Sequence, residues 1–454
     1  MISKDELLAQ AAVFDLNEAD VQRDYLFGWL ISGIFRESEL ADHVVLKGGN
    51  ALRKGYFPGT RFSDDLDLTS EQGIGAEHLL EQMNGVCRFA EAQTGVRFDI
   101  DRNRVTNERM IDETKRLFKL KLYFKDFIGA QDHITLSIRM DVSEFDRLHL
   151  APQTRQLIHP YSDSDACAAE IRCIKLEEAL AEKMKCLLQR RYCYDLFDLV
   201  YCAFVSQDIE IDRREMLDVF LRKTVFSRSP GSARALLLDL PLDLFRGYWG
   251  KVLTPKASRF SFDDAVAQLR TGLDSIFGTS GSQALAASAA FFPSRWRNII
   301  LQAGSEQRLL RMTYNNATRL VEPYSLDYRV RKSDGVGQEY FFGYDTTGGR
   351  SSGPSIKSFL HQGIQDMVIE DEKFEPRFPV QLSKSGDSDR AAYFAGTRST
   401  STRRSSTSGP KHRVQCPYCS KTFTRKVRTT ALNPHMDRFG NRCYGRRGMY
   451  LGYF

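Results

Sequence analysis

A pair of glycines and a pair of spaced aspartates constrain the fold of this chain more than any other feature. The short segment 44–46 runs into Gly48-Gly49, and residues 50–56 can start a helix. Adjacent glycines let a backbone approach a phosphate closely, and the first N–H groups of a helix attract an anion. This order predicts a phosphate-binding turn, with these candidate nucleotide-binding residues: Lys47, Gly48, Gly49, Asn50 and Ser63.

Asp65 and Asp67 follow the glycine turn within segment 62–68, in which apolar and acidic residues alternate. Because side chains two residues apart in a strand share a face, the two carboxylates can hold one or two divalent cations, and we expect Mg²⁺. Together with the glycine turn, the pair predicts a site for metal-assisted phosphoryl transfer.

Such a site needs a third carboxylate as a metal ligand or as a base. Segment 134–141 alternates most clearly, and Asp141 at its end is placed to reach the pair from a neighbouring strand. Segment 98–101 also alternates and predicts a strand. A different strand register would bring its Asp99 or Asp101 to the same place.

These motifs together resemble a known group of enzymes. A Gly-Gly turn, a helix and then an Asp-x-Asp strand are the arrangement of the nucleotidyltransferase superfamily that resembles DNA polymerase β. Over roughly residues 15–205 the chain is similar to the AbiEii/AbiGii family of abortive-infection nucleotidyltransferase toxins. The similarity rests on Asp24-Tyr25, segments 46–52 and 61–68, and the run from Glu178 through Glu182-Lys183 to segment 195–199.

The resemblance implies that a lysine and an aspartate from later helices complete the catalytic site. These are Lys183 and one or both of Asp195 and Asp198. From the residues alone, the lysine can instead form a helix-surface ion pair with Glu182 or Glu178, and the two aspartates can cap or solvate a helix.

Asn50 departs from the family pattern. The family often has Thr or Ser after the two glycines, so an amide here replaces a hydroxyl contact to phosphate. The strength of nucleotide binding is in doubt at this position.

The fold class that we expect is α+β, with a polymerase-β-like nucleotidyltransferase domain followed by smaller modules. Helical periodicity in 212–306 and alternating segments from 307 onward indicate changes of architecture. The expected parts are a nucleotidyltransferase domain (1–211), a helical region (212–306), a β module (307–382), a flexible linker (383–413) and a basic knuckle (414–454).

The β module is similar to WYL domains, which are small SH3-like or Sm-like barrels of prokaryotic defence and regulatory proteins. Tyr314, the segments 319–324 and 340–345, and Ser355-Ile-Lys-Ser-Phe support the similarity. It implies sensing of a ligand or nucleic acid, with these candidates: Arg319, Tyr328, Arg350 and Lys357. We assign most aromatic residues of this module to its core.

The last forty residues predict a structural zinc site made by Cys416, Cys419, His435 and Cys443. A Cys-x-x-Cys turn presents two thiolates to one ion, and a distant His and Cys complete a tetrahedron. A redox-active dithiol is the alternative, but it would leave the His and the last Cys without a role. The candidate nucleic-acid-binding residues around the knuckle are Lys421, Arg425, Lys426 and Arg428.

Charge separates the two ends of the chain. The net charge is +6, but residues 383–454 hold 15 Lys and Arg against 3 Asp and Glu. A basic block favours contact with nucleic acid, RNA above all and alternatively DNA, or else a solvated tail. No stretch approaches the ~20 apolar residues that cross a bilayer, and residues 1–15 lack a secretory signal. We expect a cytoplasmic protein.

We therefore predict a metal-dependent enzyme that transfers a nucleoside monophosphate from an NTP to RNA. The resemblance implies tRNA as the acceptor, a role as a toxin in phage defence, and a cognate antitoxin as partner. One alternative is a nucleotide-sensing regulator that binds nucleic acid without transferase activity. Another is kinase-like transfer to a protein through the same pocket.

Overall fold

The computed structural model falls into two compact units, residues 1–387 and 388–454. In the first unit it describes residues 2–108, 116–127, 135–190, 192–224, 230–240, 242–278, 292–330, 337–348, 353–378 and 380–382. In the second it describes short segments between 412 and 453. Within these residues no helix combines the length and apolar character needed to cross a membrane.

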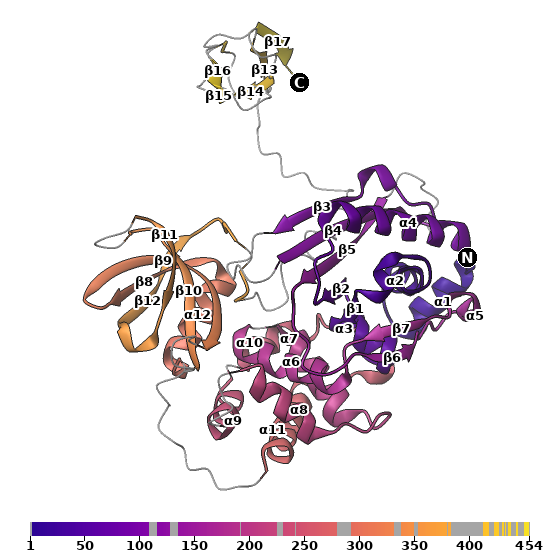
Figure 1. Cartoon of the computed structure of the whole chain (residues 1–454), viewed down its shortest axis with the longest axis horizontal. Helices are drawn as coiled ribbons and strands as arrows, with labels where there is room; N and C mark the ends of the chain where they lie inside the picture. Colours follow the sequence, from indigo (N-terminus) through magenta and orange to yellow (C-terminus); the bar gives the residue numbers. More distant parts are fainter. Residues whose placement is uncertain are drawn as a thin grey trace. The chain divides into compact units, whose positions relative to one another are not determined.

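A seven-stranded mixed sheet forms the centre of the first unit (Figure 1). β1 runs parallel to β7, β2 runs parallel to β5, and the other neighbours are antiparallel. In spatial order the strands are β3 (Arg104–Glu108), β4 (Arg116–Lys125), β5 (Thr135–Glu144), β2 (Asp65–Ser70), β1 (Val45–Lys47), β7 (Glu170–Cys173) and β6 (Gln153–Gln156). The strands that contain the predicted site residues are therefore central.

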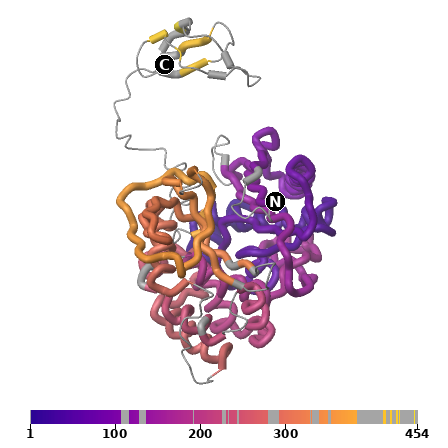
Figure 2. The backbone as a smooth tube through the Cα atoms, turned by 60° about the vertical axis from the view of Figure 1, so that its left-hand side comes forward, coloured from indigo at the N-terminus to yellow at the C-terminus, as the bar shows by residue number. Residues whose placement is uncertain are grey.

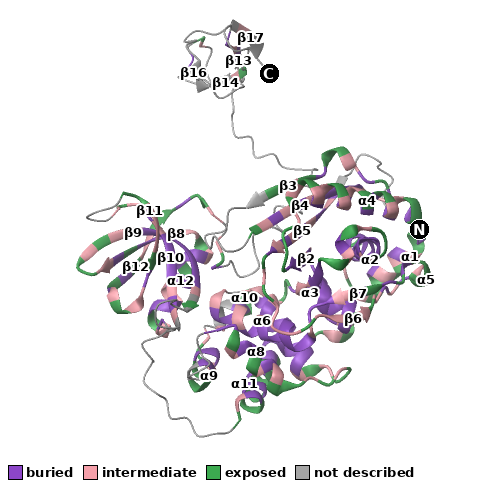
Figure 3. Cartoon of the chain, in the orientation of Figure 1, coloured by how far each residue is buried: buried purple, intermediate pink, exposed green. Residues whose placement is uncertain are grey.

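The N-terminal helices pack against this sheet, and α2 (Glu18–Glu37) is the most deeply buried of them. Asn17 caps it by accepting a hydrogen bond from the Asp20 N–H, and every residue from Asp20 to Ile34 is buried, as Figure 3 shows in purple. The other helices of this part are α1 (Lys4–Phe14), α3 (Gly48–Ala51), α4 (Ala76–Thr94) and α5 (Ser164–Cys167). A π-helical turn, Leu52–Tyr56, continues α3.

A second group of helices shares the same apolar core (Figure 2, magenta). It comprises α6 (Leu176–Gln189), α7 (Cys193–Val200), α8 (Arg213–Arg222), α9 (Pro230–Leu238), α10 (Asp243–Trp249) and α11 (Phe262–Phe277). The expected helical character of residues 212–306 is present in the described residues of that range.

The β module is a five-stranded antiparallel sheet with its own apolar core, onto which α12 (Ser294–Glu306) packs. Its order is β11 (Ser355–Phe359), β10 (Gly337–Asp345), β9 (Ala317–Val330), β8 (Arg308–Tyr314) and β12 (Ile364–Lys373). Of its binding candidates, Arg319 and Lys357 both pair with the buried Asp345. Arg350 and the side chain of Tyr328 lie outside the described residues, and the WYL assignment stays a prediction.

The second unit contains two small antiparallel sheets. One has the order β14 (Thr422–Arg425), β13 (His412–Gln415) and β17 (Met449–Tyr453), and the other pairs β15 (His435–Met436) with β16 (Arg442–Cys443). The backbone of His435 lies opposite that of Cys443, and Cys416 is buried beside Val414 and Leu432. Outside the described residues or side chains lie Cys419, Lys421, Arg425, Lys426 and Arg428, so the zinc site and its basic surface stay predictions.

The expected strand over residues 98–101 is wrong. Phe98 forms a single bridge to Phe124, and Ile100–Arg102 is a 3₁₀ turn. The N–H groups of Arg102 and Asn103 bond back to the carbonyls of Asp99 and Ile100, which closes the turn before a strand can extend. Asp99 and Asp101 therefore lie outside the strands of the central sheet.

A buried ion cluster joins α2 to the π-helical turn behind the glycines. The Asp24 carboxylate accepts from Arg53 Nε and from Lys54 Nζ, each at 2.8 Å, and from the Tyr161 hydroxyl at 2.9 Å. All four side chains are buried. Burial opposes ionisation of Asp24, but the two cations outweigh it and lower its pKa.

We expect Asp24→Asn to destabilise the chain by about 3–5 kcal/mol, because it leaves two cations buried without their counter-ion. Thermal and chemical unfolding would measure this loss. Asp263→Asn is the matched control, since it removes an exposed carboxylate that pairs with Arg246. An equal unfolding midpoint for the two variants would contradict the structural role of Asp24.

Candidate active site

The glycine turn lies in direct contact with the acidic strand. Gly48 follows the last residue of β1 with a φ of +70°, and a Cβ built there would lie 1.9 Å from Asp67 Oδ2. A Cβ on Gly49 would lie 2.7 Å from Ser63 Oγ. Only glycine fits these positions, because a side chain would occupy the space of the carboxylate and hydroxyl.

Asn50 and Ser63 hold the start of the acidic strand. Asn50 Nδ2 donates to the Asp65 carbonyl oxygen at 2.6 Å, and Ser63 Oγ donates to that oxygen at 3.2 Å and to Asp65 Oδ1 at 3.4 Å. Asn50 Oδ1 is buried and has no hydrogen-bond partner among the described residues. The amide that departs from the family pattern therefore fixes Asp65 within the fold.

Strand register brings a third carboxylate to the pair. Asp67 lies opposite Lys47 on one side and opposite Asp141 of the parallel strand β5 on the other. Burial and the charges of Asp65 and Asp141 raise the pKa of Asp67 to about 8. Within the part of the chain that the structure describes, no group of three or more His, Cys, Asp or Glu side chains is arranged to hold a metal ion.

Lys47 provides a cation beside these carboxylates. Its Nζ lies 3.1 Å from Asp146 Oδ2 and 3.4 Å from Ser143 Oγ. Burial disfavours the charged form of Lys47, but the carboxylates of Asp146, Glu182 and Asp67 outweigh it and raise its pKa. Lys47 stays charged next to the glycine turn.

Lys183, Asp195 and Asp198 meet in a buried network. Lys183 Nζ lies 3.0 Å from Asp195 Oδ1 and 2.8 Å from Asp198 Oδ2, so its partners are not Glu178 or Glu182. The two aspartates are almost completely buried, which differs from the alternative of capping or solvating residues. Burial opposes their ionisation, yet the surrounding cations lower the pKa of each.

Two arginines of this network were missed by the sequence analysis. Arg61 Nε and Nη2 donate to the two oxygens of Asp198 at 2.7 and 2.8 Å, and Arg190 donates to Asp195 at 2.6 and 2.8 Å. A Cβ on Gly49 would lie 2.9 Å from Arg61 Nη2, so Arg61 joins the glycine turn to α7. The signal for Arg61 in the sequence was its position at the start of segment 61–68.

The acidic cluster and the buried network act on each other electrostatically. The positive charge of Lys183 lowers the pKa of Asp67, although burial and the neighbouring carboxylates dominate and the net shift is upward. The sheet and the second group of helices therefore contribute to one site, which combines an anion-accepting turn, three carboxylates and two lysines.

Comparison with known proteins gives one family and two partial structural similarities. Residues 29–267, more than half of the chain, match the model of the family described as nucleotidyl transferase AbiEii toxin, type IV toxin–antitoxin system. MenT4, a nucleotidyltransferase toxin from Mycobacterium tuberculosis H37Rv, is 16% identical with a TM-score of 0.38, over 63% of this chain and 92% of MenT4. Proteasome accessory factor B/C of Arthrobacter aurescens is 18% identical with a TM-score of 0.15, over 35% of this chain and 24% of that protein. No curated protein matches the chain.

Asp67 predicts a pH dependence of stability in the metal-free protein. Its pKa is about 8 in the folded chain against a usual 3.8, so the folded state holds the proton more tightly than the unfolded state. Stability from this group is complete at low pH and falls as the pH rises from 3.8 through 8. We expect Asp67→Asn to remove this fall in unfolding measured with EDTA. A variant whose midpoint falls as steeply as that of the wild type would refute the assignment.

Gly48 and Gly75 offer a matched pair of alanine substitutions. Both have positive φ, but a Cβ at Gly75 would meet nothing within 4 Å, whereas one at Gly48 would meet Asp67. Each alanine adds about 1–3 kcal/mol of backbone strain, because L side chains rarely adopt a positive φ. Gly48→Ala should lower the unfolding midpoint further than Gly75→Ala, because it also displaces the carboxylate. Equal losses would show that the close approach has no energetic consequence.

Proposed function

The chain belongs to the AbiEii family of nucleotidyl transferase toxins, and we propose that it transfers a nucleoside monophosphate from an NTP to an RNA acceptor. Membership in a type IV toxin–antitoxin family implies a cognate antitoxin. The observation that supports the reaction best is the contact between the glycine turn and Asp67. It puts a backbone suited to phosphate beside carboxylates suited to a metal ion.

We propose Mg²⁺ as the cofactor of the acidic cluster. Asp65, Asp67 and Asp141 offer carboxylate oxygens, which are the ligands that Mg²⁺ prefers. Burial and the charges of Asp65 and Asp141 raise the pKa of Asp67, and a bound cation would relieve the repulsion among these carboxylates. When bound, Mg²⁺ would polarise the α-phosphate and neutralise part of the charge that develops there.

The protein's own groups would then orient the nucleotide. The backbone N–H groups of the glycine turn would bind the triphosphate beside Asp67, and Lys47 adds positive charge at the same end of β1. Asp141 would accept the proton of the attacking hydroxyl from the strand next to Asp67. Lys183 would offset negative charge that develops during transfer.

Asp195 and Asp198 would serve this lysine as positioning residues. Both are engaged with Lys183 and with one arginine each, so their oxygens are used within the protein. Fixing an ammonium group before the substrate binds reduces the reorganisation needed in the transition state. Arg61 would extend this positioning to the glycine turn.

We propose tRNA or another RNA end as the acceptor. The family description names nucleotidyl transfer and a toxin, and the basic block of residues 383–454 suits a polyanionic partner. The predicted zinc knuckle of Cys416, Cys419, His435 and Cys443 would fold this block into a binding surface.

The test is incubation of the purified chain with each α-³²P-labelled NTP, Mg²⁺ and total tRNA. We expect label on RNA with one donor nucleotide, and a decrease of about a thousandfold in the Asp65→Ala, Asp67→Ala double variant. Asp141→Ala should also lose transfer. Asp101→Ala is its control, because Asp101 is exposed and lies outside the sheet.

Three outcomes would contradict the proposal. Label on RNA that persists in the double variant would exclude these carboxylates from the reaction. Absence of label, with nucleotide still bound, would favour a nucleotide-sensing regulator, and label that appears on a protein only with γ-³²P donors would indicate kinase-like transfer.

A further inference from the structure

A polar pocket of about 300 Å³ lies on the sheet face that contains Asp67. Val45 of β1 and Thr69 of β2 both line it, and they are paired in the sheet register. Because side chains two residues apart share a face, Thr69 is on the same face as Asp67 and Val45 is on the same face as Lys47. The pocket and the acidic cluster are therefore neighbours along one face.

The pocket and the glycine turn lie on opposite sides of Asp67. The turn contacts Asp67 from the end of β1, whereas the pocket is lined by Val45 at the start of that strand. Asp146 connects the two regions, since it lies 3.1 Å from Lys47 Nζ and accepts from Thr69 Oγ1 at 3.4 Å. Along the strand, the order is glycine turn, carboxylates, pocket.

This order has a chemical consequence for nucleotidyl transfer. The attacking and leaving oxygens of a phosphoryl transfer lie roughly in line on opposite sides of the phosphorus. If the glycine turn holds the leaving pyrophosphate, the attacking hydroxyl must approach from the other side of the carboxylates. The pocket is on that side.

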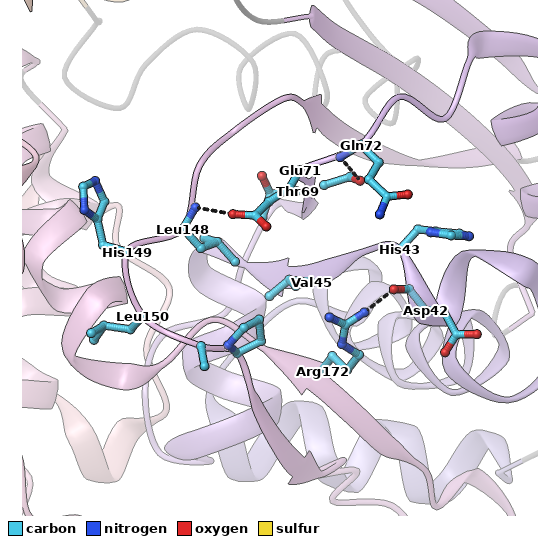
Figure 4. A pocket seen from close by; sticks show the side chains of 13 residues that line it. Asp42, His43, Val45, Thr69, Glu71, Gln72, Leu148, His149, Leu150 and Arg172 are labelled. Atoms are coloured by element: carbon cyan, nitrogen blue, oxygen red, sulfur yellow. Dashed lines mark hydrogen bonds between the residues drawn. The ribbon is translucent and has the colours of Figure 1, made fainter.

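The lining suits an uncharged nucleoside better than a phosphate. Val45, Leu148, Leu150 and Pro152 offer apolar surfaces for the faces of a base. Figure 4 shows His43, Gln72 and Arg172 on one side of the pocket and Leu148, His149 and Leu150 on the other.

The charged groups of the lining point to the same occupant. The carboxylates of Asp42 and Glu71 would repel a phosphate, and Arg172 already donates to the carbonyl oxygen of Asp42. A cavity of this size accepts one nucleoside and not a duplex.

The wall formed by residues 148–150 is held in place by hydrogen bonds. The Glu178 carboxylate accepts from the His149 N–H at 2.9 Å and from the Leu150 N–H at 2.7 Å, and Glu71 accepts from the Leu148 N–H at 3.3 Å. Phe145, with a φ of +59°, turns the chain from β5 into this segment. The pocket therefore exists before any ligand binds.

We propose that this pocket receives the terminal nucleoside of the RNA acceptor and directs its hydroxyl toward the carboxylates. The inference rests on the proposed function for its chemistry. It adds the place where the acceptor binds, which is separate from the triphosphate site at the glycine turn.

Photo-crosslinking tests the pocket without any catalysis. The probe is an RNA hairpin whose single-stranded 3′ end carries 4-thiouridine, irradiated with the full chain in buffer that contains neither Mg²⁺ nor a chelator, and mapped by mass spectrometry. We expect crosslinks within residues 42–45, 69–72 or 148–152. Under the same conditions 4-thio-UTP, as a donor probe, should not crosslink there.

Ala151→Phe fills the pocket from an exposed position, and Ala267→Phe adds the same bulk to an exposed position of α11. Ala151→Phe should lower the yield of the RNA crosslink about tenfold. It should also raise the KM for RNA about tenfold and leave the KM for NTP unchanged. Ala267→Phe should behave as the wild type in both measurements.

The outcomes separate this inference from the proposed function. RNA that crosslinks elsewhere or not at all, or 4-thio-UTP that crosslinks in the pocket, would overturn the acceptor site. Absence of label transfer in the wild type, together with a crosslink in the pocket, would reject the enzyme activity and retain the binding site. Because mapping uses the wild type, the result stands even where Ala151→Phe fails to fold.

Discussion

The close approach of Gly48 to Asp67 is the contact on which the rest of the site depends. A Cβ on residue 48 would overlap the Asp67 carboxylate. The backbone can therefore approach this carboxylate only because residue 48 is glycine. The turn is held from behind by Asp24, which binds both cations of the π-helical turn that follows. An ion cluster in the core thus holds the segment that follows the glycine turn.

Electrostatics divide the site into two clusters that differ in how well their charges are balanced. In the network of Lys183, Arg61 and Arg190, every carboxylate has a cationic partner, and the pKa of Asp195 and of Asp198 is lowered. In the acidic cluster, burial and neighbouring acids raise the pKa of Asp67. The balanced cluster stabilises the fold, whereas the unbalanced one keeps the pKa of Asp67 far above its usual value. Such a division is typical of sites where stability is given up for function.

Patterns within a few neighbouring residues predicted much of this arrangement. The contacts between residues far apart in the sequence could not be predicted from such patterns. The glycine turn, the Asp-x-Asp strand and the strand that contains Asp141 follow from local patterns, although that strand continues to Glu144 and does not end at Asp141. Segment 98–101 shows the limit, because four alternating residues close into a turn as readily as they extend.

The partners of Lys183 could not be read from its helix. Glu182 and Glu178 are close to Lys183 in the sequence, but Asp195 and Asp198 reach it from another helix. Arg61 was visible in the motif, yet its role depends on Asp198, 137 residues away along the chain. Asn50 was predicted to contact a phosphate. The sequence alone does not show that its side-chain amide donates to the Asp65 carbonyl oxygen.

The register of β1 and β2 links the core to the chemistry. Leu46, Leu66 and Leu68 are completely buried, while the alternate positions of the same two strands include Lys47, Asp65 and Asp67. Because the period of a strand is two residues, a slip by one position would exchange these sets and bury the charges. The apolar face therefore fixes the order of turn, carboxylates and pocket on the other face. Hydrophobic burial, which has no direction of its own, in this way determines which polar side chains share one face of the sheet.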